Sequence, residues 1–238
     1  MNTPPLVLNP ILETRVLAQQ FAGAGRVQVA DFLAPEAAAA WHDNLAARTD
    51  WLRVINSGEK VFELGREAQA ALTPEAATRL DAGVYAGARE GFQFRFSTIR
   101  VPDEADARAA SADPLAQFAA FMSSGKVLDL LRAITGASAI TFADAQATAY
   151  HPGDFLTAHD DAVTGKGRHA AYVFGLTPVW RAEWGGLLLF HDAARVHDGY
   201  VPALNTLNLF RVPQPHSVSE VTRAAPAPRL AITGWLRG

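Results

Sequence analysis

The chain has 238 residues, of which 49% are hydrophobic and 19% charged, so it can bury one sizeable core and is neither a disordered tail nor a fibrous repeat. A formal net charge of -3 provides no basic footprint for direct nucleic-acid binding. The absence of cysteine excludes disulfides, thiolate metal sites and a cysteine nucleophile. Any metal site must therefore use the seven histidines together with carboxylates and water.

The chain shows no targeting or membrane signal. Its N-terminus lacks a basic region followed by an uninterrupted apolar run, so we expect no signal peptide. No stretch approaches the roughly 18 apolar residues of a spanning helix. We therefore expect a cytoplasmic protein without membrane attachment.

The first half is predicted to be mostly helical, with a few strands. Helices are expected at residues 11–24, 36–49, 73–89, 113–124 and 126–136, because these segments combine helix-forming residues with proline starts and glycine ends. Strands are expected at residues 26–33 and 91–101, and the second of these places Phe92, Phe94 and Phe96 on one face. Residues 51–57 and 60–65 read as a hairpin, which is a candidate lid. Residues 103–113 read as an acidic surface loop.

From Ser138 onward, short β-rich runs follow one another without long helices between them, which is typical of an antiparallel sandwich or barrel. The predicted class is α+β, mainly β: a double-stranded β-helix, or cupin-like jelly roll, with packed N-terminal helices. We expect one domain over residues 1–238, with residues 1–137 as helical support and residues 138–238 as the jelly-roll core.

The best candidate metal ligands are His159 and Asp161. In an extended strand they share a face, and one more histidine would complete a two-histidine, one-carboxylate site of the kind that suits non-haem Fe(II). On this tripeptide alone, a surface histidine and aspartate at a strand end is the simpler interpretation. His216 is favoured as the third ligand because it lies in a β-rich run. The sequence leaves five other histidines open: His42, His151, His169, His191 and His197.

The last β-rich run, RLAITGWL, places Arg229, Ala231, Thr233 and Trp235 on one face. An arginine beside small residues has room to reach inward, where its planar fork can hold a carboxylate through two hydrogen bonds. The simpler alternative is an exposed arginine at the start of a strand.

Taken in order, His159-x-Asp161, Gly185-Gly186, His216 and Arg229 resemble the Fe(II)/2-oxoglutarate-dependent oxygenases, in particular their prolyl 4-hydroxylase-like branch. The phrases HDD, HSVSEV and RLAITGW are similar to those of the eukaryotic ribosomal-protein prolyl hydroxylases. The resemblance covers roughly residues 139–238 and is only architectural before them.

The resemblance implies His159, Asp161 and His216 as iron ligands and Arg229 as the partner of the C5 carboxylate of 2-oxoglutarate. It also implies Tyr150 as a hydrogen-bond donor to this cosubstrate and Arg168 as a substrate-binding residue. One departure is Ala231, because many members carry serine or threonine there. The hydrogen bond is then lost or supplied elsewhere, and Thr233 is a candidate because it lies on the same face.

The implied function is hydroxylation of a prolyl residue in a protein or peptide, with succinate and CO2 as co-products. Fe(II), 2-oxoglutarate and O2 are required, ascorbate is an optional cofactor, and a ribosomal protein is one candidate substrate. The presence of Asp161 favours hydroxylation over halogenation, because related halogenases lack this carboxylate. Two alternatives remain: the same chemistry on a free amino acid or other small molecule, and a non-enzymatic jelly-roll binding module.

Overall fold

The computed structural model describes residues 4–238. The helices are α1 (Thr14–Ala24), α2 (Pro35–Ala46), α3 (Arg66–Ala70), α4 (Pro74–Glu90), α5 (Ala105–Ala110), α6 (Pro114–Met122) and α7 (Gly125–Thr135), with one 3-10 turn, η1 (Ala182–Trp184). The strands are β1 (Arg26–Val29), β2 (Leu52–Ser57), β3 (Lys60–Leu64), β4 (Phe94–Arg100), β5 (Phe142–Ala143), β6 (Gln146–Tyr150), β7 (Phe155–His159), β8 (Arg168–Gly175), β9 (Leu188–His191), β10 (Val196–Tyr200), β11 (Thr206–Arg211), β12 (His216–Val218) and β13 (Arg229–Arg237).

These strands form one antiparallel sheet that curls on itself. Its main path runs β1-β11-β8-β13-β6-β4-β7-β12-β9-β10, with β2 and β3 added beside β4. Strand β4 joins the two halves, because Phe94 and Arg95 pair with β7 whereas Ser97 and the residues after it pair with β6. The larger half therefore faces the smaller half, β7-β12-β9-β10, across an inner space. This confirms the predicted jelly roll.

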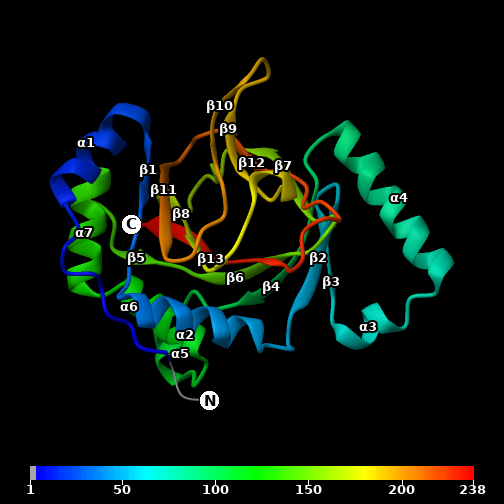
Figure 1. Cartoon of the computed structure of the whole chain (residues 1–238), viewed down its shortest axis with the longest axis horizontal. Helices are drawn as coiled ribbons and strands as arrows, with labels where there is room; N and C mark the ends of the chain where they lie inside the picture. Colours follow the sequence, from blue (N-terminus) through cyan, green and yellow to red (C-terminus); the bar gives the residue numbers. More distant parts are fainter. Residues whose placement is uncertain (1–3) are drawn as a thin grey trace.

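The main core lies between the outer face of the larger half and the helices. Alternate residues of β13, among them Leu230, Ile232 and Leu236, are buried there against side chains such as Trp41 and Phe118. Figure 1 shows α1, α2, α6 and α7 gathered beside this part of the sheet, while α3 and α4 form a separate arm at the opposite end. The inner residues of β13 are thus left for the space between the two halves.

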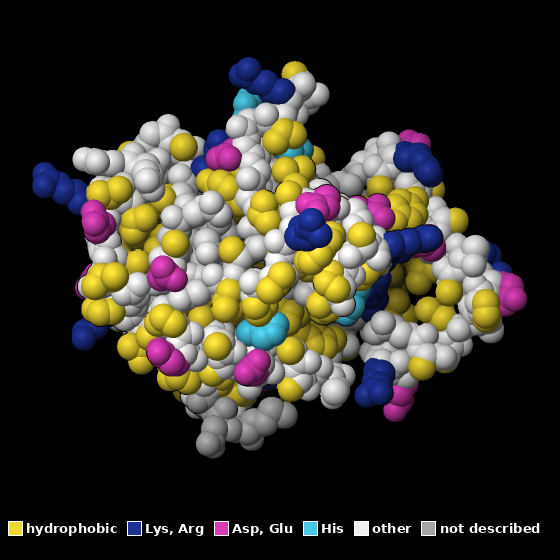
Figure 2. Space-filling view, viewed as in Figure 1, with side chains coloured by type: hydrophobic (Ala, Val, Ile, Leu, Met, Phe, Trp, Pro, Cys, Tyr) yellow, Lys and Arg dark blue, Asp and Glu magenta, His cyan; other side chains and the backbone are white. Residues whose placement is uncertain are grey.

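The arm touches the sheet along a narrow contact. Figure 2 shows a hollow between the arm and the body, with apolar side chains inside it, and this hollow has a volume of about 310 Å³. Leu64, Leu72 and Leu80 are among its lining residues. Across residues 4–238, every helix is too short or too polar to cross a membrane.

Most of the predicted elements occur, with three differences. The predicted loop at residues 103–113 contains α5, because its alanine-rich centre favours a helix and the buried Arg108 donates a 2.7 Å hydrogen bond to the carbonyl of Asp103. Strand β10 was not predicted, and it pairs with β9. The short helix α3 was not predicted.

A buried carboxylate connects the hairpin β2–β3 and β4 to the segment that leads into β7. Asp154 is fully buried, and its oxygens lie 2.6 Å from Arg53 Nη2 and 3.4 Å from Arg95 Nε. The same carboxylate accepts a 2.8 Å hydrogen bond from the backbone N–H of His151. Because β7 ends in His159, this cluster fixes the strand that carries a candidate ligand.

We expect Asp154→Ala to lower the free energy of unfolding by about 3–5 kcal/mol, because it leaves the largely buried Arg53 without its carboxylate and Arg95 with only the exposed Asp81. Urea denaturation measures the loss. Asp129→Ala, which removes an exposed partner of Arg132, is the matched control and should change stability by less than about 0.5 kcal/mol. Equal losses in the two variants would contradict the role of Asp154.

Candidate metal centre and the cavity beside it

Two short strands of the smaller half bring His159 and His216 together. They are register partners at the end of β7 and the start of β12, and their ring centroids are 4.1 Å apart. Asp161 follows two residues after His159, and its carboxylate oxygens lie 3.5 Å from Nε2 of each histidine. Among residues 4–238, His159, Asp161 and His216 form a cluster in which the potential metal-binding atoms all lie within 4.8 Å of one another.

The histidines are oriented and protonated as metal ligands require. Nδ1 of His159 lies 3.0 Å from the carbonyl oxygen of Thr157, and Nδ1 of His216 lies 2.8 Å from that of Gln214. A carbonyl oxygen can only accept, so each Nδ1 carries the hydrogen and each Nε2 presents a lone pair. Burial, followed by the nearby His159, holds the pKa of His216 below its usual value, so this imidazole is neutral at pH 7.

The donor set therefore fits a divalent transition metal. Two imidazole nitrogens and one carboxylate on the same side of a site match the two-histidine, one-carboxylate arrangement of non-haem Fe(II) proteins. Aromatic rings pack beside the imidazoles, with Phe210 4.6 Å from the His216 ring and Phe92 5.6 Å from the His159 ring. These rings limit the access of water to the ligand atoms.

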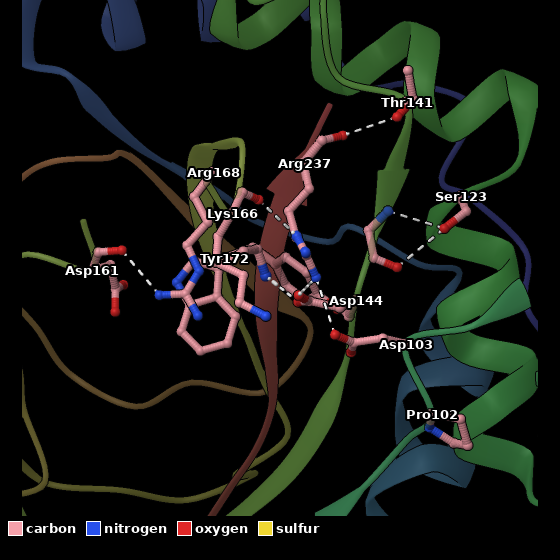
Figure 3. Close-up of polar contacts among 12 residues, drawn as sticks. Pro102, Asp103, Ser123, Thr141, Asp144, Asp161, Lys166, Arg168, Tyr172 and Arg237 are labelled. Carbon is pink, nitrogen blue, oxygen red and sulfur yellow. Dashed lines mark hydrogen bonds and ion pairs between the residues drawn. The ribbon is translucent and has the colours of Figure 1, made fainter. Parts of the chain in front are cut away.

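The backbone of Asp161 is held by Arg168. Asp161 adopts φ 64°, a left-handed conformation that typically costs a non-glycine residue about 1 kcal/mol or more. Arg168 Nη1 donates a 2.9 Å hydrogen bond to the carbonyl of Asp161, and its guanidinium carbon lies 3.5 Å from the ring centroid of Trp235. Figure 3 shows Arg168 reaching from the sheet to Asp161. Arg168 thus supports the conformation that aims the carboxylate at the histidines.

A cavity of about 200 Å³ extends from the three ligands between the two halves of the sheet. Arg229 and Tyr150 line it together with the ligands. Arg229 is 4% exposed, its guanidinium carbon lies 5.1 Å from the ring centroid of Tyr150, and burial lowers its pKa. Among residues 4–238, no carboxylate forms an ion pair with Arg229. A buried cation without a counter-ion favours an anionic ligand.

Tyr150 is buried next to this cation. Its ring stacks on Phe96 with a centroid distance of 5.2 Å, and burial raises the pKa of its phenol. The phenol is therefore protonated at neutral pH and can donate a hydrogen bond. The structure thus brings Tyr150 and Arg229 to the same cavity.

The Gly-Gly pair makes room at this end of the cavity. Gly186 has φ 64°, and a Cβ atom there would lie 3.2 Å from Cδ of Arg229. Gly185 has φ 71°, and its Cβ would collide with the backbone carbonyl of Glu220. The left-handed backbone therefore favours glycine at both positions, and at Gly185 the collision with a backbone atom excludes any larger residue.

An outer groove of about 350 Å³ continues from the cavity, and Phe94, Phe96 and Trp235 line both. Arg168 lies in its wall, where its Nε atom is buried without a hydrogen-bond partner, as is Nε1 of Trp235. Figure 3 shows Arg237 at the same wall, paired with Asp103 and Asp144. Arg168 therefore lies between the candidate metal ligands and the groove.

The remaining histidines lie apart from the three ligands. His191 Nε2 is 2.8 Å from the hydroxyl of Ser217, and the exposed His197 pairs with Asp192 in the β9–β10 turn. His42 contacts the carbonyl of Leu176, and His151 lies beside Asp154. Thr148 is among the cavity residues that sequence reasoning missed, although its spacing of two from Tyr150 indicated the same face.

Comparisons with known proteins agree with this geometry. Residues 145–237 match the model of the 2OG-Fe(II) oxygenase superfamily. A segment of 103 residues is 32% identical to mouse prolyl 3-hydroxylase OGFOD1, and this match covers 40% of the chain but only 18% of the mouse protein.

Two solved structures share the fold. A Pseudomonas putida prolyl-4-hydroxylase superposes with a TM-score of 0.57 at 21% identity, covering 94% of this chain and 98% of that one. A Trichoplax adhaerens prolyl hydroxylase, in complex with a hypoxia inducible factor oxygen degradation domain peptide fragment, superposes with a TM-score of 0.59 at 16% identity, covering 94% and 88%.

We expect His216→Ala to weaken Fe(II) binding by more than about 100-fold, because loss of a ligand should exceed the loss of an outer partner. Equilibrium dialysis under argon measures the dissociation constant. His191→Ala is the matched control, since His191 lies on the adjacent strand β9 and contacts Ser217 instead. Equal weakening in both variants would exclude the site described above.

We expect Arg168→Ala to weaken Fe(II) binding by about 10-fold or more without any substrate, because the carbonyl of Asp161 loses its donor. The same dialysis measures this change. Arg100→Ala, which removes an exposed arginine of the outer groove, should leave the metal affinity unchanged. Unchanged affinity in Arg168→Ala would restrict this arginine to the groove.

Proposed function

We propose that the protein is a 2-oxoglutarate-dependent hydroxylase that acts on a prolyl residue in a protein or peptide. The match of residues 145–237 to the 2OG-Fe(II) oxygenase superfamily model supports this proposal. One observation carries the proposal. A metal-ligand set and a buried arginine without a counter-ion line the same cavity. A small molecule with a chelating group at one end and a carboxylate at the other satisfies both.

His159, Asp161 and His216 are the residues that would hold Fe(II). Fe(II) together with O2 and 2-oxoglutarate supplies the oxidising power for hydroxylation, with succinate and CO2 as co-products. Arg229 binds the C5 carboxylate of 2-oxoglutarate through its planar fork, and Tyr150 donates a further hydrogen bond. Burial of both residues strengthens these bonds, because water does not compete for the carboxylate.

The outer groove supports a peptide as the substrate. The groove shares part of its wall, including Phe96 and Trp235, with the cavity that holds the metal ligands. An extended chain in the groove would therefore lie next to the cavity, so that one of its residues could reach toward the ligands. Arg168 lies in the wall of the groove, and its guanidinium carries further N–H groups besides the one that bonds to Asp161. Peptide carbonyl groups would satisfy such donors. A ribosomal protein is one candidate source of the peptide, given the resemblance of HDD, HSVSEV and RLAITGW to the ribosomal-protein prolyl hydroxylases.

The β2–β3 hairpin is the proposed lid. Val61 lines the outer groove and is 45% exposed, and the neighbouring Phe62 is 43% exposed. Exposed apolar side chains on a two-stranded hairpin can gain burial by closing over a bound chain. This proposal agrees with the position of the hairpin at the end of the sheet, beyond β4.

We expect the protein, supplied with Fe(II), 2-oxoglutarate and O2, to form succinate in proportion to hydroxylated proline in a proline-containing peptide. Tandem mass spectrometry locates the added oxygen, and Asp161→Ala should form neither product. Oxygen added to a free amino acid but not to peptides would overturn the peptide assignment in favour of a small-molecule hydroxylase. Absence of succinate under every condition would overturn the enzymatic function.

A further inference from the structure

The cosubstrate carboxylate needs more donors than Arg229 provides. A carboxylate offers about four acceptor positions, and a guanidinium fork fills two of them. Tyr150 can fill a third. In a cavity that excludes water, the remaining position needs a donor from the protein, because an unmet hydrogen bond is costly there.

The inner face of the sheet is organised in rows across the strands. Arg229 on β13 is the register partner of Tyr150 on β6. In the next row, Ala231 on β13 lies opposite Thr148 on β6, and Gly175 on β8 lies on the other side of Ala231. In this row, Thr148 therefore carries the side-chain hydroxyl nearest to Arg229. It lies next to Ala231, whose side chain has no hydroxyl.

The other hydroxyls on this face are too far away. Thr233 is four residues from Arg229 along β13, which corresponds to about 13 Å between their Cα atoms. Arg229 does not bridge this span, because its guanidinium lies over Tyr150 in its own row. Thr98 is the register partner of Thr148 on β4 and lies two strands, roughly 10 Å, from β13. Diagonal neighbours such as Thr148 and Arg229 are about 7–8 Å apart at Cα.

The hydroxyl of Thr148 is buried and available. Its side chain lines the cavity and is 2% exposed. Within residues 4–238 it has one hydrogen bond, a long one of 3.4 Å to the carbonyl of Ala231. A hydroxyl rotates freely, so it can donate to a stronger acceptor in the cavity.

We propose that Thr148 is a cosubstrate-binding residue, donating a hydrogen bond to the same carboxylate that Arg229 holds. This inference rests on the proposed function and identifies the residue that compensates for Ala231. The hydroxyl comes from Thr148 on β6, which is paired with Ala231 on the neighbouring strand β13.

The test is calorimetric titration of the Fe(II)-loaded protein with 2-oxoglutarate under argon, so that binding is measured without turnover. Thr148→Val removes the hydroxyl and keeps the shape, and should raise the dissociation constant about tenfold, the value of one buried hydrogen bond to a charged group. Thr148→Ser should stay close to the original protein. Unchanged Fe(II) affinity in both variants shows that the site is intact.

Two further experiments separate this role from a general packing effect. In the double variant Thr148→Val with Ala231→Ser, the hydroxyl moves to the facing strand and should restore most of the affinity. The probe 2-oxovalerate lacks the distal carboxylate, so it should bind the original protein and Thr148→Val equally well.

The proposal is overturned if Thr148→Val leaves 2-oxoglutarate binding unchanged, if Thr233→Val causes the larger loss, or if 2-oxovalerate loses as much affinity as 2-oxoglutarate. These outcomes leave the proposed function intact. Failure of the original protein to bind 2-oxoglutarate at all would instead overturn both.

Discussion

The site depends on the register of two short strands. Pairing His159 of β7 with His216 of β12 brings the imidazoles to 4.1 Å, although the two residues are far apart in the chain. Strand β12 has only three residues and lies between β7 and β9, so both neighbours fix its position. A shift of one residue would turn His216 to the opposite face and remove it from Asp161. The buried Asp154, which ties the start of β7 to β2 and β4, supports this register.

Each imidazole is oriented by backbone alone. The carbonyls of Thr157 and Gln214, each two residues before its histidine, accept the Nδ1 hydrogens. The histidines of this cysteine-free chain are therefore oriented for metal binding although no buried carboxylate accepts a hydrogen bond from either Nδ1. The one strained residue of the site is Asp161, and there a side chain, Arg168, provides the support.

The sequence predicted those parts of the site that follow from alternation along a strand. The inward face that begins at Arg229 is such a local pattern along β13, so it could be read directly. The pairing of His159 and Asp161 was also expected from alternation, but β7 ends at His159 and Asp161 reaches the histidines through a left-handed backbone conformation. The choice of His216 among six histidines relied on its β-rich surroundings and on resemblance. Thr148 was missed because its proximity to Arg229 arises from pairing between β6 and β13, which no local pattern records. Strand β10 was missed for a similar reason, because its pairing with β9 stabilises a segment whose composition resembles that of a loop. Helix α5 was missed because we gave the acidic residues of the segment more weight than its alanine-rich centre, which favours a helix.

The rows across the larger half have a consequence for how relatives of this chain are recognised. A sequence motif that requires a hydroxyl-bearing residue two positions after Arg229 fails at Ala231, whose side chain is a methyl group. The paired positions Ala231 and Thr148 together carry one side-chain hydroxyl, which belongs to Thr148. In a cavity wall made of several strands, a hydroxyl group can be supplied by either of two paired residues, and the cavity then offers the same hydrogen bond. Two-dimensional patterns, defined by pairing as well as by spacing, would therefore group proteins that linear motifs separate.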